Sequence, residues 1–140
     1  GETARLMLTL KTVLARADYI PTLIFDEIDQ GIGGRVGAVV GAKLWRLTVD
    51  EGGEAAHQVL CITHLPQLAG FGDAHYRVQK IVTAGRTVTE VARLLHEERL
   101  AELAQMLGTE GGSALQGAGE LLEQSERMKT HTVEGDGASG

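Results

Sequence analysis

The chain has 140 residues, of which 43% are hydrophobic, so it can bury the core of one modest globular unit but not of two independent domains. Its 13 Lys and Arg against 19 Asp and Glu give a formal net charge of −6, which argues against strong autonomous binding to nucleic-acid phosphates. A single cysteine, Cys61, excludes an internal disulfide, and neither a membrane-spanning apolar run nor a secretion signal is visible. We therefore expect a cytoplasmic protein with no membrane partner.

The first predicted element is an amphipathic helix over residues 2–17, with leucine and valine at helical spacing. Because this helix would begin almost at Gly1, we expect the sequence to be part of a longer chain. After Pro21 comes the uninterrupted apolar run 22–25, which is typical of a central parallel strand covered on both faces.

A helix is predicted over residues 35–49, because valine and leucine recur there along one face. The acidic and glycine-rich residues 50–54 end it as a solvated loop, and residues 58–62 then form a second buried strand. Strand, helix and strand in this order predict a right-handed parallel crossover. The sheet is therefore expected to be at least partly parallel.

A short helical turn is expected after Pro66, followed by an edge hairpin of residues 76–82 and 86–91 that borders the sheet. Two C-terminal helices are predicted over residues 94–107 and 113–128. The sequence thus predicts an α/β fold, with residues 1–131 forming one lobe of parallel central strands flanked by helices. Residues 132–140 are expected to be a disordered tail, because they offer little to bury.

The most informative residues are two adjacent carboxylates, Asp26 and Glu27, directly after the first apolar strand. Open parallel sheets bind ligands at this C-terminal edge. A carboxylate such as Asp26 suits Mg²⁺, directly or through water, because hard cations take oxygen ligands. Glu27 would then face elsewhere and could orient and deprotonate a hydrolytic water. The alternative is that both residues only cap a loop.

The second strand ends in Thr63 and His64, which places an imidazole on the same expected edge of the sheet. Such a histidine could contact the γ-phosphate of a nucleotide; the alternative is an ordinary loop histidine. Cys61 and the scattered histidines match no zinc-ligand spacing, so a zinc site is not expected.

The glycines at 31, 33 and 34 admit two interpretations, a close backbone approach to a ligand or a flexible connection before the helix. No phosphate-cradling Gly-x-x-x-x-Gly-Lys-Ser/Thr loop is present, because the nearest match, residues 37–44, has Ala42 and Leu44 at required positions. Without that loop this chain alone is predicted neither to hold nor to hydrolyse ATP.

The order of these features resembles the C-terminal half of an ATP-binding-cassette head, a partial P-loop NTPase fold. In that comparison Gly1 and Glu2 resemble the end of the signature motif, residues 23–27 the Walker B strand, and His64 the switch histidine. The strings 25–35 and 59–67 resemble the RecN family of bacterial SMC-like proteins for DNA double-strand-break repair. Ile32-Gly33 stands where transporter cassettes and chromosomal SMC heads carry other residues.

The resemblance implies an ATPase in the full-length protein, with ATP and Mg²⁺ as cofactors. Its implied residues are Glu27 and His64 for catalysis, Asp26 for the metal, and Gly1, Glu2, Gln30, Gly31 and Gly33 near the nucleotide. Its implied partners are the N-terminal half of the same head with the Walker A loop and a coiled coil, a second head in an ATP-dependent homodimer, and DNA, which implies association with the nucleoid. The alternatives are a head of a transporter or another SMC-family ATPase, or a non-catalytic interaction module with this fold.

Overall fold

The computed structural model describes residues 9–10, 20–49, 56–108 and 111–135, with side chains as far as residue 131. Of the helix predicted over residues 2–17, only Thr9 and Leu10 are described; both are helical, and Leu10 is buried in the core. Gly1 and Glu2 lie outside the described residues, so their predicted part in nucleotide binding stays a prediction.

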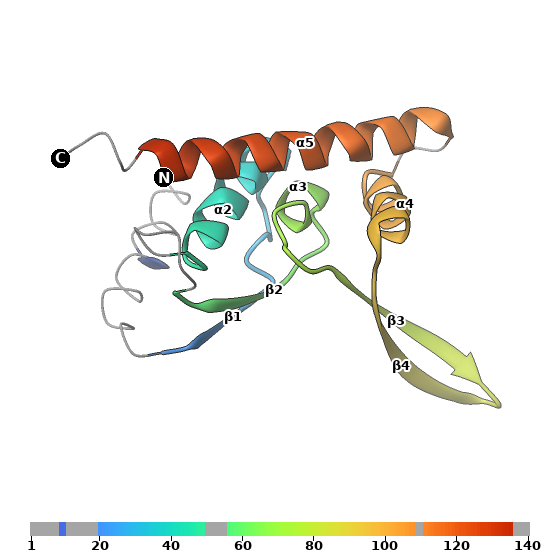
Figure 1. Cartoon of the computed structure of the whole chain (residues 1–140). Coiled ribbons are helices and arrows are strands. Elements are labelled where there is room, and N and C mark those ends of the chain that lie inside the picture. Colours follow the sequence, from blue (N-terminus) through green and yellow to red (C-terminus); the bar gives the residue numbers. More distant parts are fainter. Residues whose placement is uncertain (1–8, 11–19, 50–55, 109–110, 136–140) are drawn as a thin grey trace.

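Two parallel strands, β1 (Thr22–Asp26) and β2 (Gln58–Ile62), form the sheet on which the site is built. The helix α2 (Gly34–Arg46) connects them and lies on one face of the sheet (Figure 1). The predicted strand, helix and parallel strand are therefore confirmed, although α2 ends earlier than predicted. Val40 and Leu44 of α2 are buried in the core between this helix and the sheet.

The short helix α3 (Pro66–Ala69) packs closely against α2 because glycines face it. A Cβ atom added at Gly37 would collide with the side chain of Leu65, and one added at Gly41 would collide with the ring of Phe71. Glycine is thus required on this face of α2 for the two helices to approach, a packing role that differs from the loop role of Gly31.

The opposite face of the β1–β2 sheet is exposed, which corrects the prediction that these strands are covered on both faces. Ile24 is 68% exposed, and its neighbours Leu60 and Ile62 on β2 are 46% and 56% exposed. Side chains alternate along a strand, so the residues between them, Phe25 and Cys61 among them, pack toward α2. In the described part of the chain no helix covers the outer face (Figure 1).

The predicted hairpin is confirmed as the antiparallel pair β3 (Tyr76–Thr83) and β4 (Arg86–Arg93). Its two turn residues, Ala84 and Gly85, both have left-handed backbones with φ of 50° and 74°, as a type I′ turn requires. Its predicted place beside the first sheet is wrong. The hairpin is a separate two-stranded sheet that projects from the helices (Figure 1), and Arg77 of β3 forms an ion pair with Glu102 at 3.9 Å.

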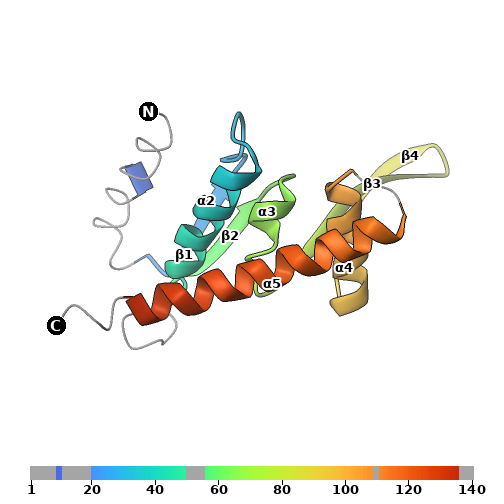
Figure 2. The ribbon, with the colours of Figure 1, turned by 90° about the horizontal axis from the view of Figure 1, so that it is seen from above.

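Two further helices, α4 (His96–Met106) and α5 (Gly112–Gly135), complete the described fold. The long helix α5 passes across α2, α3 and α4 (Figure 2), and its Ala118 is fully buried against Leu103 of α4. The disordered tail was predicted to begin at residue 132, but α5 continues through residues 132–135. The predicted start of the tail is therefore too early. Residues 136–140 lie outside the described part.

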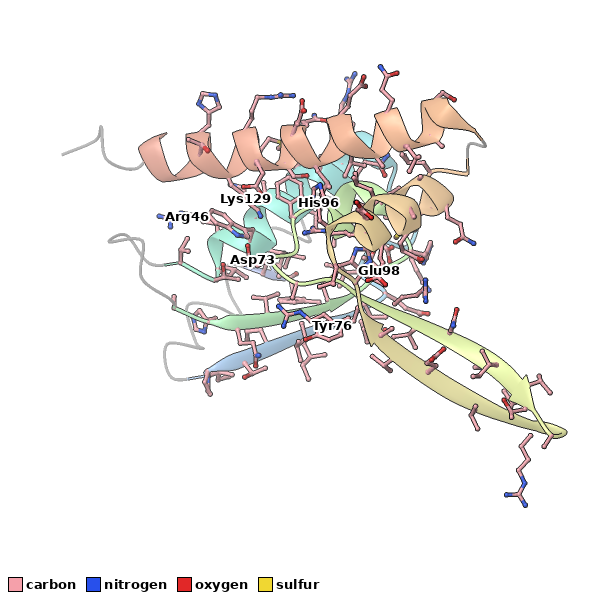
Figure 3. All side chains as sticks on the ribbon, turned by 45° about the vertical axis from the view of Figure 1, so that its right-hand side comes forward. Arg46, Asp73, Tyr76, His96, Glu98 and Lys129 are labelled. Atoms are coloured by element: carbon pink, nitrogen blue, oxygen red, sulfur yellow. The ribbon has the colours of Figure 1, made fainter. Side chains whose placement is uncertain are left out.

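Polar contacts fix α5 to the rest of the fold. The indole Nε1 of Trp45 donates to Asp73 Oδ1 at 3.1 Å, and Lys129 Nζ of α5 lies 3.4 Å from the same oxygen. Figure 3 shows Asp73 and Lys129 facing one another. Lys129 also pairs with Glu126 at 2.9 Å, so its nearly buried ammonium has two carboxylate partners, as a buried charge requires.

Candidate functional site

The edge of the sheet where β1 and β2 end carries the polar residues singled out in the sequence. In the parallel register Asp26 lies opposite Ile62. The backbone N–H of Glu27 donates to the carbonyl of Ile62 at 3.2 Å, which extends the pairing one residue past the strand. Thr63 and His64 follow directly. The two chain segments that bear the acid pair and the histidine therefore meet at one edge, as predicted.

Glu27 adopts an unusual backbone conformation at this edge. Its φ is 54°, in the left-handed region that non-glycine residues rarely occupy. Such a conformation costs on the order of 1–3 kcal/mol and is concentrated at functional sites. Asp26 and Glu27 are both exposed, and the Nε2 of Gln30 donates to Glu27 Oε2 at 3.0 Å. The carboxylate of Glu27 is thus held in place yet accessible.

Asp29 joins the two segments of the edge, and the sequence analysis assigned it no function. It is 3% exposed, and its Oδ2 accepts hydrogen bonds from the Thr63 hydroxyl and, at 3.0 Å, from the backbone N–H of His64. Thr63 Oγ1 in turn accepts the backbone N–H of Leu65 at 3.0 Å. The signal in the sequence was a third acidic residue after the pair Asp26-Glu27, opposite a threonine at the end of the next strand.

The charge of Asp29 is stabilised where it lies. Burial raises the pKa of this carboxyl, but the hydrogen bonds from Thr63 and His64, together with the nearby imidazole, outweigh burial and leave the pKa below its ordinary value. The His64 Nδ1 is 3.6 Å from Asp29 Oδ2, while the histidine side chain is 81% exposed. The main chain of His64 is therefore fixed, and its ring faces solvent.

The loop between the site and α2 depends on one glycine for its conformation. Gly31 has φ of 73°, whereas Gly33, which precedes the first turn of α2, has an ordinary φ of −88°. Open space surrounds both positions. Gly31 thus permits the turn, because glycine adopts a positive φ without strain.

The donor atoms at the edge fit Mg²⁺ only if a ligand contributes oxygens. No group of three or more His, Cys, Asp or Glu in the described residues could hold a metal ion by itself. Asp26 is exposed, and its carboxylate makes no hydrogen bond or ion pair with another residue of the described ranges. Because Mg²⁺ is commonly held by one or two carboxylates together with substrate phosphates, this arrangement fits a metal carried in with a nucleotide.

Cys61 lies close to this edge but is unsuited to nucleophilic chemistry. Burial, with a smaller contribution from the charge of Asp29, raises the pKa of its thiol to about 11. The thiolate, which is the nucleophile and the metal ligand, is therefore scarce at neutral pH.

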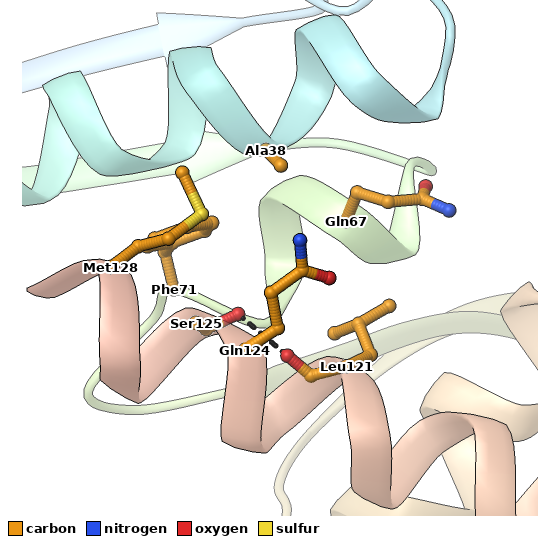
Figure 4. A pocket seen from close by; sticks show the side chains of 7 residues that line it. All are labelled: Ala38, Gln67, Phe71, Leu121, Gln124, Ser125 and Met128. Atoms are coloured by element: carbon orange, nitrogen blue, oxygen red, sulfur yellow. Dashed lines mark hydrogen bonds between the residues drawn. The ribbon is translucent and has the colours of Figure 1, made fainter.

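A small pocket lies elsewhere, on the face of α2 and α3 that α5 covers (Figure 4). It is lined by Gln67, Phe71 and Ser125 among others, and the hydroxyl of Ser125 already donates to the carbonyl of Leu121 at 2.9 Å. None of its lining residues belongs to the edge with Asp26 and His64. This pocket is therefore separate from the candidate site.

No family model matches the chain, but proteins of known name are similar to it. It is 44% identical over 130 residues to the DNA repair protein RecN of Xylella fastidiosa, covering 91% of this chain and 22% of that protein. It is 46% identical to the RecN proteins of Vibrio cholerae and Deinococcus radiodurans, in each case over 87% of this chain and covering 21% and 20% of those proteins. The chain therefore spans about a fifth of the length of the curated relatives it matches.

A solved structure has a similar fold. An SMC ATPase, studied for ATP-driven dimerization and DNA-stimulated activation, matches 79% of this chain and 63% of its own chain, with a TM-score of 0.55 and 19% sequence identity. At that identity the match establishes the fold. Within the described residues no helix is long and apolar enough to cross a membrane. The chain is thus a RecN-like segment, similar to about a fifth of a RecN DNA repair protein, and it has the α/β fold of part of an SMC ATPase head.

Proposed function

We propose that this chain supplies the water-activating edge of the ATP-hydrolysing head of a DNA repair protein. The observation that carries the proposal is the parallel register in which Asp26 lies opposite Ile62. It brings the Asp26-Glu27 pair and the Thr63-His64 pair to a single edge of the sheet. Open parallel sheets bind their ligands at this edge.

Each residue at the edge has a separate part in the proposed chemistry. Asp26, exposed and without a partner in the described residues, would hold Mg²⁺ together with the phosphates of ATP. The metal supplies neutralisation of phosphate charge when bound. Glu27 would orient the attacking water and accept its proton. His64, with its ring 81% exposed, would contact the γ-phosphate and sense its presence.

The remaining part of the active site would come from other segments. The chain has no glycine-rich loop with a lysine for the β- and γ-phosphates, so it would be inactive alone. We infer that the N-terminal half of the same head supplies the Walker A loop. The outer face of the β1–β2 sheet, with Ile24, Leu60 and Ile62 exposed, supports a partner of this kind, because a patch of large apolar side chains is usually covered.

The biological setting is inferred from the relatives. The similarity to RecN DNA repair proteins favours recombinational repair of broken DNA over membrane transport or chromosome condensation. The SMC ATPase with this fold was studied for ATP-driven dimerization, which favours two heads that sandwich ATP. In such a dimer Gln30, Gly31 and Gly33 would lie at the contact between heads, and Gly1 and Glu2 would approach the partner's nucleotide. DNA would bind the full-length protein, in the cytoplasm at the nucleoid.

The proposal is tested by Glu27→Gln in the full-length protein. Because only the proton acceptor is lost, ATP hydrolysis should slow by roughly 10²–10⁴-fold while ATP affinity is retained. Glu123→Gln on α5 makes the same chemical change at an exposed position and should leave turnover unchanged. Normal turnover of the Glu27→Gln protein would rule out the assignment, and absence of nucleotide binding by the unaltered protein would favour a non-catalytic module.

A further inference from the structure

We infer that Asp29 is a positioning residue that holds His64 in a fixed place relative to Glu27. This inference rests on the proposed function, because it assigns Asp29 a part in the same reaction. The sequence had indicated only that Asp26, Glu27 and His64 lie at the ends of neighbouring strands. The structure adds a buried carboxylate that joins the segment after β1 to the segment after β2.

The contacts of Asp29 converge on one atom. Its Oδ2 accepts from the Thr63 hydroxyl and from the backbone N–H of His64 at 3.0 Å. Both donors belong to the loop that carries the histidine. Since Asp29 follows Glu27 by two residues in the same turn, the turn and the histidine loop are tied together by side-chain bonds as well as by strand pairing.

The way in which His64 is held distinguishes positioning from catalysis by Asp29 itself. Asp29 is 3% exposed and is out of reach of a ligand at the rim. It binds the main chain of His64 and leaves the ring exposed. Fixing the backbone while the ring stays free sets the direction from which the imidazole can approach a phosphate. A misplacement of about 1 Å at such a position can cost on the order of 100-fold in rate.

Geometry and charge can be separated at this position. The Oδ1 atom of Asp29 is buried and has no hydrogen-bond partner within the described residues, so Oδ2 does the holding. Asn retains one oxygen acceptor and loses the charge, whereas Ala loses both. The contact of Asp29 Oδ2 with the His64 ring, at 3.6 Å, is an ion pair only when the imidazole is protonated, and the ring is 81% exposed to water, which weakens the attraction. Asn should therefore replace Asp29, and Ala should not.

The experiment uses the full-length protein and compares kcat for ATP hydrolysis with the Kd for ATP. For Asp29→Ala we expect kcat per folded molecule to fall about 10- to 100-fold, with the Kd changed less than about threefold. Asp29→Asn should keep kcat within about threefold of the unaltered protein. Thr63→Val and Thr63→Ser form a second pair, which serves if Asp29→Ala does not fold; Thr63→Ser should keep kcat and Thr63→Val should lower it.

The control for a purely structural effect is Leu103→Ala, which opens a cavity at a fully buried position of α4, in a core cluster that contains no residue of the histidine loop. It should lower stability and leave the kcat of the folded protein unchanged. Full activity of both Asp29→Ala and Thr63→Val, or an equal loss in Asp29→Asn and Asp29→Ala, would overturn the inference. If those variants are active while Glu27→Gln is not, only the positioning by Asp29 fails; if Glu27→Gln is active, the proposed function itself fails.

Discussion

The side-chain amide of Gln30 donates a hydrogen bond to the carboxylate of Glu27, with 3.0 Å between Nε2 and Oε2. The two residues lie on the same turn, three positions apart, and both are exposed. The bond occupies one oxygen of Glu27 and leaves the other available. Gln30, predicted from the family resemblance to lie near the nucleotide, thus also orients the proposed proton acceptor.

Replacing Gln30 by Leu removes this bond and leaves Glu27 with more rotational freedom. We expect kcat for ATP hydrolysis by the full-length protein to fall on the order of tenfold, since orientation of a catalytic group contributes strongly to rate. Steady-state kinetics measure the change. The double variant Gln30→Leu with Glu27→Gln should be no slower than Glu27→Gln alone, and additive losses would contradict a role for Gln30 through Glu27.

The lowered pKa of Asp29 predicts a loss of stability in acid. Hydrogen bonds from Thr63 and His64 favour the charged carboxylate in the fold. The associated stability is therefore fully present above the ordinary aspartate pKa of about 3.9, and it is lost as the pH falls through the lower pKa of the folded state. Denaturant unfolding from about pH 6 to pH 2.5 measures how the free energy of unfolding changes with pH. Asp29→Asn, which cannot ionise, should lose less stability over the same range; identical slopes would contradict the assignment.

Two glycine-to-alanine changes should act in opposite directions. At Gly41 the added Cβ collides with the ring of Phe71, so we expect a loss of about 1–3 kcal/mol from overpacking between α2 and α3. At Gly119, inside α5, a Cβ meets no atom within 4 Å, and a gain of about 0.5–1 kcal/mol is expected from the better helix former. Thermal unfolding of the two variants reports the sign. A rise in Tm for Gly41→Ala would refute the close packing.

We expect Lys129 and Asp73 to show a measurable coupling energy, although their contact contributes little to the stability of the fold. The Lys129 side chain is 8% exposed and that of Asp73 is 68% exposed, so solvent weakens the pair. Asp73→Ala should cost about 1 kcal/mol or less when Lys129 is present, and less again in the Lys129→Met background, with a coupling energy of about 0.5–1 kcal/mol. A double-mutant cycle measures this energy. Equal costs in both backgrounds would mean that Asp73 acts only through Trp45.

Local patterns were sufficient to predict the sheet and the hairpin. The apolar runs at 22–25 and 58–62 carry enough signal for two parallel strands, and the residues after each run necessarily meet at one edge. Gly85 marks the turn of the hairpin because few other residues accept its backbone angles. The approximate site, with Asp26, Glu27 and His64 on one rim, followed from these local features alone.

Features that depend on distant partners were missed. Asp29 looks like any loop carboxylate until Thr63, 34 residues later, is brought beside it. The separate position of the hairpin depends on how α3 and α4 pack, and no residue within the hairpin encodes that. The C-terminal end of α5 was placed too early, at residue 128, because residues 129–135 are helical without an apolar pattern of their own, and helix already formed upstream favours its own extension.

The outer face of the β1–β2 sheet has a practical consequence. This face carries a contiguous apolar patch formed by Ile24, Leu60 and Ile62. Apolar patches of this kind promote aggregation when no partner covers them. Produced by itself, the segment should collect in inclusion bodies or co-purify with chaperones. Co-expression with the remainder of the polypeptide should return it to the supernatant.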